Sequence, residues 1–105
     1  MNKIANVRLK VVGVSFKNND GTDRQAIIGA MTKNSPVILR REPDNTYDRN
    51  AVAVDSIDGQ VGDIGKDYAK IIASLMDAGR VFKATVDIVD RYEGTNYLHI
   101  MINEE

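Results

Sequence analysis

Apolar and polar residues alternate along three segments of this chain, and each alternation predicts a β-strand. In residues 7–14, valine and leucine at every second position alternate with arginine and lysine, the pattern of a half-buried strand. Residues 81–89 and 97–102 alternate in the same way, and the turn-forming residues 93–96 between them predict a terminal hairpin. The expected buried positions of this hairpin are Phe82, Ala84, Val86, Ile88, Leu98, Ile100 and Ile102.

Shorter apolar runs in the middle of the chain predict further strands. Residues 37–39 form a β-rich run directly after Pro36, and residues 51–54 form a second extended run. Asp58 and Gly59 predict a hairpin turn that leads into a strand at residues 60–62.

Helical spacing is clearest in residues 66–78, where apolar side chains fall on one stripe and Gly79 stands at the C-terminal cap position. The stripe consists of Tyr68, Ile71, Ile72, Leu75 and Met76.

A shorter helix is expected after Thr22 or Asp23, either of which could cap its first turn. Its shared apolar face consists of Ile27, Ile28 and Met31, although Gly29 interrupts it. Pro36 and the residues before it are expected to end this helix, because proline forces its predecessor into extended geometry.

Five or six short strands and two helices without a βαβ rhythm predict a mainly β, α+β fold. The expected architecture is a small antiparallel barrel or a strongly bent sheet. A length of 105 residues suits one hydrophobic core, so the expected organisation is one domain over residues 1–105.

Composition excludes several classes of site. The chain has no cysteine, which excludes disulfides, cysteine zinc sites and thiol nucleophiles and favours a reducing cytoplasm. No apolar run suits a signal peptide or approaches the roughly 20 residues of a membrane span, so no membrane partner is expected. A net charge of −1 gives no support to nucleic-acid binding, although a local basic patch would still attract a polyanion.

Catalytic chemistry finds no support in the residues. His99 is the single histidine and lies in a predicted strand, where a partly exposed surface role is expected. The acids Glu42, Asp44, Asp48 and Asp55 do not follow the spacing of a calcium loop, and no phosphate-binding glycine motif occurs. We therefore expect a binding module with no enzymatic activity, cofactor or metal.

The loop of residues 40–50 is the strongest candidate binding element, because Tyr47 lies in it among arginines, acids and asparagines. An aromatic flanked by such groups can stack on a base while its neighbours contact sugar hydroxyls. The alternative is structural: Asp44, Asn45, Asp48 and Asn50 would bond their own backbone as turn residues, with Arg41 and Glu42 forming a solvated ion pair.

Residues 41–54 read REPDNTYDRNAVAV and resemble the signature of the HIRAN domain, close to R-E-P-x-N-P-x-D-x-N-A-[IV]-x-V. The similarity includes Val12-Gly13-Val14 with the aromatic Phe16, and Gly59-Gln60-Val61-Gly62 before the helix that begins at Lys66. It covers about residues 11–79.

This resemblance implies a six-stranded barrel related to OB folds and SH3-like barrels, with two helices attached. It also implies a pocket that holds the 3′-hydroxyl end of single-stranded DNA between two aromatic side chains. Carried over onto matching positions, Phe16 and Tyr47 would be the aromatics, Asp48 the acceptor of the terminal hydroxyl, Asn45 a contact to the end nucleotides and Lys66 a phosphate partner. Arg41 and Asp44 complete the set of residues expected to bind DNA.

Four positions depart from the family pattern. Ser15 replaces a basic residue, Thr46 replaces a proline, Asp44 stands where asparagine is common, and Asp63 occupies a position that is often basic or aromatic. These changes reduce the expected attraction for phosphate.

Three functions follow in order of support. The first is binding of single-stranded DNA ends in repair or replication-fork processing. The second is a protein-interaction module using the same pocket, for a partner involved in DNA processing. The third is a metal-dependent hydrolase or nuclease.

Overall fold

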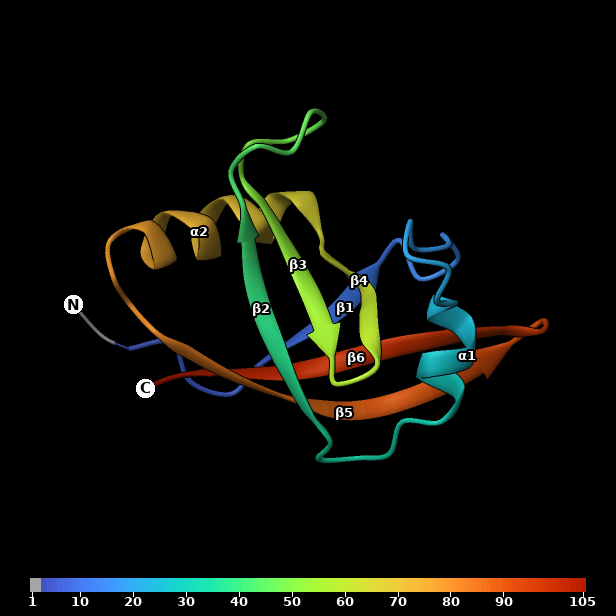
Figure 1. The fold of residues 1–105 in the computed structure, drawn as a ribbon. Coiled ribbons are helices and arrows are strands. Elements are labelled where there is room, and N and C mark those ends of the chain that lie inside the picture. Colours follow the sequence, from blue (N-terminus) through green and yellow to red (C-terminus); the bar gives the residue numbers. More distant parts are fainter. Residues whose placement is uncertain (1–2) are drawn as a thin grey trace.

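Six strands form a closed antiparallel barrel in the computed structural model, which describes residues 3–105 (Figure 1). The order around the barrel is β1-β4-β3-β2-β5-β6. The strands are β1 (Val7–Val12), β2 (Pro36–Glu42), β3 (Ala51–Ser56), β4 (Gly59–Ile64), β5 (Phe82–Tyr92) and β6 (Thr95–Glu104). The helices are α1 (Arg24–Gly29) and α2 (Lys66–Asp77). The structure confirms the predicted mainly β fold with two helices, and the sheet is a closed barrel, not an open bent sheet.

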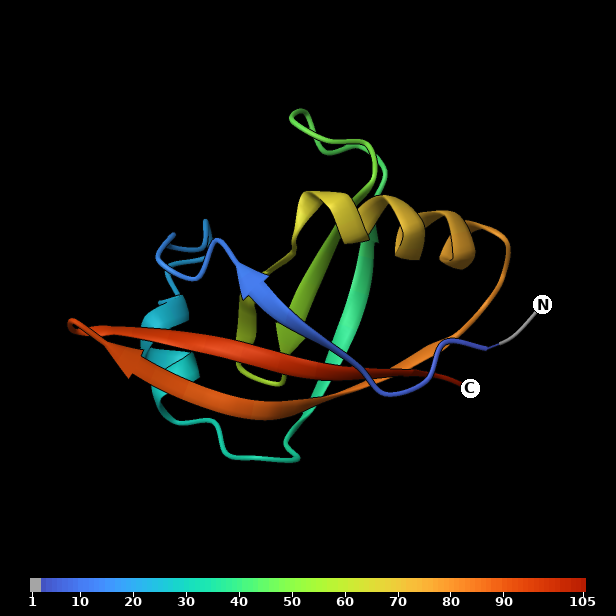
Figure 2. The ribbon, with the colours of Figure 1, turned by 180° about the vertical axis from the view of Figure 1, so that it is seen from behind.

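The two helices lie at different ends of the barrel (Figures 1 and 2). Helix α1 lies beside the tip of the long β5–β6 hairpin, and α2 lies across the opposite end, next to the loop between β2 and β3. Asp23 caps α1 by accepting the backbone N–H of Gln25, as one of the two expected caps. Of the stripe predicted for α2, Ile72 is buried and Tyr68 and Met76 pack against the core, whereas Ile71 is 50% exposed, so its expected place on the stripe is wrong. The small residues Ala69 and Ala73, which the stripe did not include, are buried instead.

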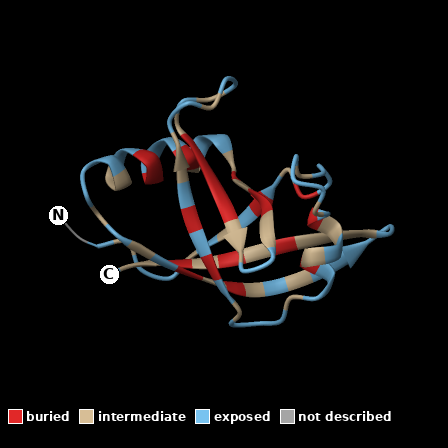
Figure 3. Cartoon of the chain, viewed as in Figure 1, coloured by how far each residue is buried: buried red, intermediate tan, exposed pale blue. Residues whose placement is uncertain are grey.

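The core occupies the inside of the barrel, where alternate residues of each strand meet (Figure 3). Strand β3 is buried at four consecutive positions, Ala51 to Val54. Val52 and Val54 belong to the core cluster, while Ala51 and Ala53 alternate with them and are buried on the outer face of the strand.

The junction between β1 and β4 is short and close. These strands pair only through Val11 with Ile64 and Val12 with Asp63. Gly62 makes the close approach possible, because a β-carbon there would overlap Cγ1 of Val11 and the carbonyl oxygen of Val12. The junction fixes Asp63 beside the end of β1.

One strand face differs from the sequence prediction. A bulge between Val86 and Ile88 shifts the register of β5 against β6, so the alternation reverses beyond it. Ile88 is 43% exposed, whereas Val89 packs against the core. The expected burial of Ile88 is therefore wrong, because a bulge adds a residue that hydrophobic periodicity does not reveal.

Three boundaries also differ. Strand β1 ends at Val12 because Gly13 adopts a positive φ of 70°, which turns the chain. Helix α1 ends at Gly29, so Met31 lies beyond it, and Pro36 begins β2 instead of ending the helix. Within residues 3–105, neither helix is both long and apolar enough to span a membrane.

Candidate single-stranded nucleic-acid interface

Two exposed aromatic rings, Phe16 and Tyr47, border one hollow of about 640 Å³. Their exposed fractions are 68% and 95%, so neither ring is part of the core. We call this hollow the aromatic slot; its lining residues are Phe16, Asn19, Arg24, Glu42, Asn45, Tyr47, Gln60 and Asp63. The structure thus brings together the two aromatics that the sequence places 31 positions apart.

Phe16 is held by the turn that follows β1. Its backbone N–H donates to the carbonyl oxygen of Gly13 at 3.3 Å. Arg24, which is 8% exposed, donates from Nη1 to the same carbonyl and from Nε to Oδ1 of Asn18, both at 2.8 Å. A buried guanidinium with these partners fixes the segment that carries the ring.

Tyr47 is held by side chains of its own loop. Oδ1 of Asn45 accepts the backbone N–H groups of Tyr47 at 2.9 Å and Asp48 at 3.0 Å. Oδ1 of Asp48 accepts the N–H of Asn50 at 2.9 Å. The structural alternative is therefore confirmed for Asn45 and Asp48, and it leaves Oδ2 of Asp48 without a hydrogen-bond partner among residues 3–105.

A second hollow of about 360 Å³ adjoins the slot at Tyr47, Asn45 and Asp63. We call it the terminal hollow; its lining residues are Val12, Asn45, Tyr47, Asp48, Ala51, Asp63, Ile64 and Lys66. Lys66, at the start of α2, is exposed. Five of the seven predicted site residues therefore lie around two connected hollows: Phe16, Asn45, Tyr47, Asp48 and Lys66.

The structure does not bring Arg41 into either hollow. Its Nε and Nη2 donate to the carboxylate of Asp77 at 2.9 and 3.1 Å, which ties β2 to α2. This hydrogen-bonded pair raises the pKa of Arg41, and the charge of Asp48 adds to the effect. The expected pair of Arg41 with Glu42 does not form, because consecutive strand residues point to opposite faces. Asp44 is exposed and lines neither hollow.

The floor of the aromatic slot is acidic. Burial raises the pKa of Asp63, and the neighbouring Glu42 carboxyl raises it further, against the opposing charge of Arg24. Arg24, Glu42 and Gln60 were not singled out as site residues from the sequence. Glu42 and Gln60 lie in segments that match the family pattern and Asp63 is a departure from it, so these three gave a signal without being assigned to the site.

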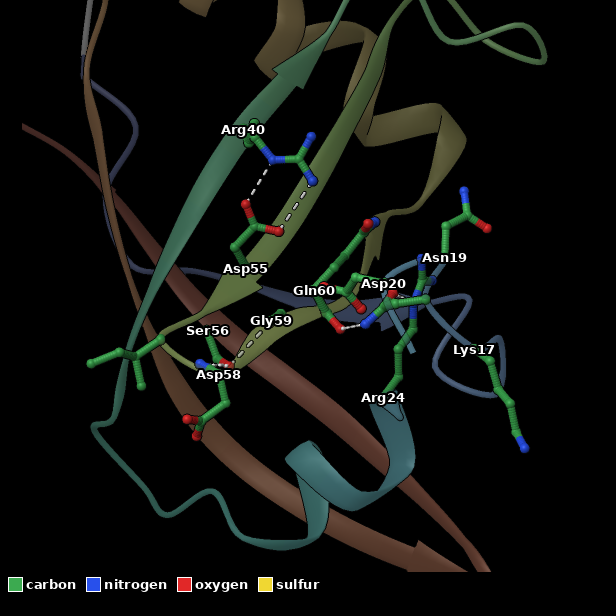
Figure 4. Close-up of a pocket in the computed structure, with 12 residues that line it drawn as sticks. Lys17, Asn19, Asp20, Arg24, Arg40, Asp55, Ser56, Asp58, Gly59 and Gln60 are labelled. Carbon is green, nitrogen blue, oxygen red and sulfur yellow. Dashed lines mark hydrogen bonds and ion pairs between the residues drawn. The ribbon is translucent and has the colours of Figure 1, made fainter. Parts of the chain in front are cut away.

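Another hollow of about 630 Å³ lies beside the slot and shares Asn19, Arg24 and Gln60 with it (Figure 4). Arg40 and Asp55 face each other there, with nitrogen–oxygen distances of 2.7 and 3.3 Å. Because this arginine is paired, it adds little free positive charge for phosphate.

On the other side of Phe16, the ammonium group of Lys10 lies 4.7 Å from the ring centroid of Tyr97. Both residues line a hollow of about 340 Å³ that also contains Phe16 and Ser15. Lys10 thus lines a hollow shared with Phe16, and Lys66 lines a hollow shared with Tyr47.

Residues 3–105 contain no group of three or more histidine, cysteine or acidic side chains placed to hold a metal ion. His99 lies half-buried in β6, as expected, and its Nδ1 is buried without a hydrogen-bond partner among the same residues.

The comparisons with known proteins agree on one family. The sequence model of the HIRAN domain matches residues 4–103. Helicase-like transcription factor of Mus musculus is 44% identical over 50 residues, which are 47% of this chain and 5% of that protein. The Homo sapiens protein of the same name is 42% identical over 50 residues with the same coverage. This chain thus spans about a twentieth of the length of these relatives.

Two solved structures share the fold along nearly the whole chain. A Lactobacillus plantarum protein superimposes with a TM-score of 0.80 and 25% identity, covering 98% of this chain and 95% of that one. The HIRAN domain of human HLTF superimposes with a TM-score of 0.70 and 25% identity, covering 98% of this chain and 78% of that one.

Proposed function

Because this chain belongs to the HIRAN domain family, a family of DNA-binding domains, we propose that it binds the free 3′-hydroxyl end of single-stranded DNA without catalysing a reaction on it. The intermediates of DNA repair or of replication-fork processing would supply such ends. The cytoplasm would be the place of action, beside protein partners of the same process.

The observation that carries this proposal is the pair of exposed rings, Phe16 and Tyr47, on one hollow. Both rings are exposed to solvent, and hydrogen bonds fix the loop and the turn that carry them. They can therefore stack on a flat ligand. Base stacking on an aromatic side chain contributes about 1–3 kcal/mol per base and tolerates any sequence. Stacking therefore supplies affinity even where phosphate attraction is weak.

Asp48 supports the choice of an end over an internal stretch. One carboxylate oxygen is used in its own turn, and the other is unpartnered among residues 3–105 beside Tyr47 and Lys66. A carboxylate only accepts hydrogen bonds, so it binds a terminal hydroxyl and repels a terminal phosphate. Lys66 lines the same hollow, and we propose that it contacts the phosphate that precedes the terminal sugar.

The test compares two 5′-labelled single strands that differ only in ending with a 3′-hydroxyl or a 3′-phosphate. Fluorescence anisotropy is expected to show tighter binding of the hydroxyl end. Tyr47→Ala is expected to weaken both, by about tenfold for one lost stacking contact. Asp48→Asn, which keeps an oxygen for the turn, is expected to remove the preference. Tyr92→Ala, which changes a 65%-exposed ring on β5, is the matched control and is expected to bind normally.

Equal binding of both ends would contradict the role of Asp48. Cleavage of the strand on addition of a divalent metal would contradict a purely binding function.

The acidic floor of the slot favours a second candidate function. Glu42 and Asp63 line the same hollow as the two aromatic rings, a combination that also suits a lysine or arginine side chain of a partner protein. Under this function the slot would bind a basic peptide segment. Absence of binding to either DNA end, with Tyr47 still needed to retain a protein partner, would decide for it.

A further inference from the structure

We propose that Glu42 and Asp63 read the edge of the base held in the aromatic slot and favour bases that present an exocyclic amino group. This inference rests on the proposed function, because it assumes that a nucleotide enters the slot. Stacking on the two rings does not depend on the base, whereas the two acidic side chains would select among bases.

The strand register places both carboxyl groups on the same outer face of the barrel. Glu42 is opposite Ala51 and Asp63 is opposite Ala53, and these two alanines lie on one face of β3. Alanine side chains are too small to fill the space between β2 and β4. The carboxyl groups therefore lean toward each other above β3 and form the floor of the slot.

A bulge brings a third polar group to this floor. The register of β3 against β4 shifts between Val54 and Asp55, so Gln60 comes to lie on the same face as Asp63 although the two are three positions apart. Nε2 of Gln60 lies 3.4 Å from Oδ1 of Asp63, which agrees with this placement.

The two carboxylates are poorly satisfied by their neighbours. Nη1 of Arg24 lies 3.7 Å from Oδ2 of Asp63, and Nη1 of Arg40 lies 3.5 Å from Oε2 of Glu42. Good N–H···O bonds have distances of about 2.7–3.2 Å. Arg40 instead makes its short contact, 2.7 Å, to Asp55. The two carboxyl groups also bond to each other, and their remaining oxygens are available to a ligand that donates hydrogen bonds.

The negative charge of the slot floor favours ligand groups that donate hydrogen bonds. The two carboxyl groups lie close enough to interact, and burial together with Glu42 raises the pKa of Asp63, in agreement with repulsion between two negative charges at this place. Amino groups at cytosine N4, adenine N6 and guanine N2 would relieve this repulsion. Thymine and uracil present a carbonyl oxygen at the corresponding position, which two carboxylates would repel.

The sharpest probe is a pair of 5′-labelled strands ending in three deoxycytidines or three deoxyuridines, both with a free 3′-hydroxyl. The two rings have the same size, so stacking on Phe16 and Tyr47 differs little and the comparison isolates the amino group. We expect the deoxycytidine end to bind about fivefold tighter or more, the discrimination of one good base contact.

Two variants test the floor residues. Asp63→Asn and Glu42→Gln each introduce a donor in place of an acceptor and should bring the ratio of the two dissociation constants close to one. Asp58→Asn is the matched control, because it removes an exposed acid from the β3–β4 turn outside the slot. It should change both affinities by the same factor. Thermal unfolding checks that each variant is folded. If Asp63→Asn does not fold, Glu42→Gln alone tests the inference.

The outcomes separate this inference from the function on which it rests. Equal affinity for the two ends, with the preference for a 3′-hydroxyl intact, overturns base reading and leaves the proposed function standing. If the ratio of the two dissociation constants is the same in both floor variants as in the parent protein, base reading is also overturned. The two acids would then act only by repelling phosphate. Absence of binding to both strands contradicts the proposed function itself.

Discussion

The side-chain oxygen of Asn45 lies 2.9 Å from the backbone nitrogen of Tyr47 and accepts its hydrogen bond. The same oxygen also accepts the N–H of Asp48, so one amide group sets the position of both the ring and the carboxylate.

We therefore expect Asn45→Ala to weaken binding of 3′-hydroxyl ends about tenfold, since the loop must be ordered when the ligand binds. The stability loss should be about 1–2 kcal/mol, because the substitution removes two hydrogen bonds that each contribute about 1 kcal/mol or less. Anisotropy titration and urea unfolding measure the two effects. Thr46→Ala, in the same loop but exposed, is the control and should leave both unchanged. Unaltered binding by Asn45→Ala would show that the loop does not need this support.

Salt dependence distinguishes Lys66 from other lysines. A lysine that contacts a phosphate of single-stranded DNA changes the slope of log K against log salt by about 0.7. Lys66→Ala should therefore flatten the slope by about this amount and weaken binding at low salt. Lys83→Ala, on the face near β2 and β5, should leave the slope unchanged. A slope that is the same in Lys66→Ala and the parent protein would remove Lys66 from the interface.

Most of the fold follows from periodicity in the sequence. Apolar residues at every second position identify β1 and β6, and apolar residues at helical spacing identify α2. Barrel closure does not follow, because it depends on which strands become neighbours, and β1 pairs with β4 through residues that are more than 50 positions apart in the sequence. The two bulges also escape prediction, since each adds a residue without changing composition.

The candidate site was predictable where residues match the family pattern, which includes Phe16 and Lys66 outside the Tyr47 loop. The motif around Tyr47 gave Asn45 and Asp48, which lie together in the structure. Arg41 belongs to the same motif, yet strand geometry turns it to the other face and Asp77 binds it. The slot floor was not predictable, because Glu42 and Asp63 meet only through the register of β3 with its two neighbours.

The bulge in β5 predicts unequal effects at two adjacent residues. Val89 packs against the core while Ile88 is 43% exposed. Val89→Ala should therefore reduce the free energy of unfolding by about 1–2 kcal/mol, and Ile88→Ala by less than about 0.5 kcal/mol. Urea unfolding of the two variants provides the comparison. The reverse order would mean that the alternation continues through β5 without a bulge.

Gly62 should tolerate no side chain. A β-carbon there would overlap Val11 and the backbone of Val12, so Gly62→Ala is expected to cost about 1–3 kcal/mol as β1 and β4 are pushed apart. Gly65→Ala is the control, because the nearest atom, Cγ1 of Val12, would lie 3.8 Å from its β-carbon in ordinary contact. Thermal unfolding should show a lower midpoint for the first variant and a nearly unchanged one for the second. Equal midpoints would mean that the junction can widen freely.

Glu104 predicts how stability changes in acid. Its carboxylate accepts hydrogen bonds from Arg80 at 2.5 and 2.6 Å and from the backbone N–H of Ile4 at 3.0 Å. These contacts lower the pKa of Glu104 from 4.5 to about 2. A carboxyl group with a lowered pKa in the folded state stabilises the protein above its unfolded pKa and loses that effect as the pH falls toward the folded value.

Glu104→Gln should consequently unfold at a lower temperature than the parent protein at pH 7. The difference should shrink below pH 4.5 and disappear near pH 2. Glu105→Gln removes the adjacent, exposed carboxylate and should follow the parent protein at every pH. Thermal melts across this range test the sign directly: a difference that grows as the pH falls would mean that the pairing with Arg80 does not stabilise the folded state.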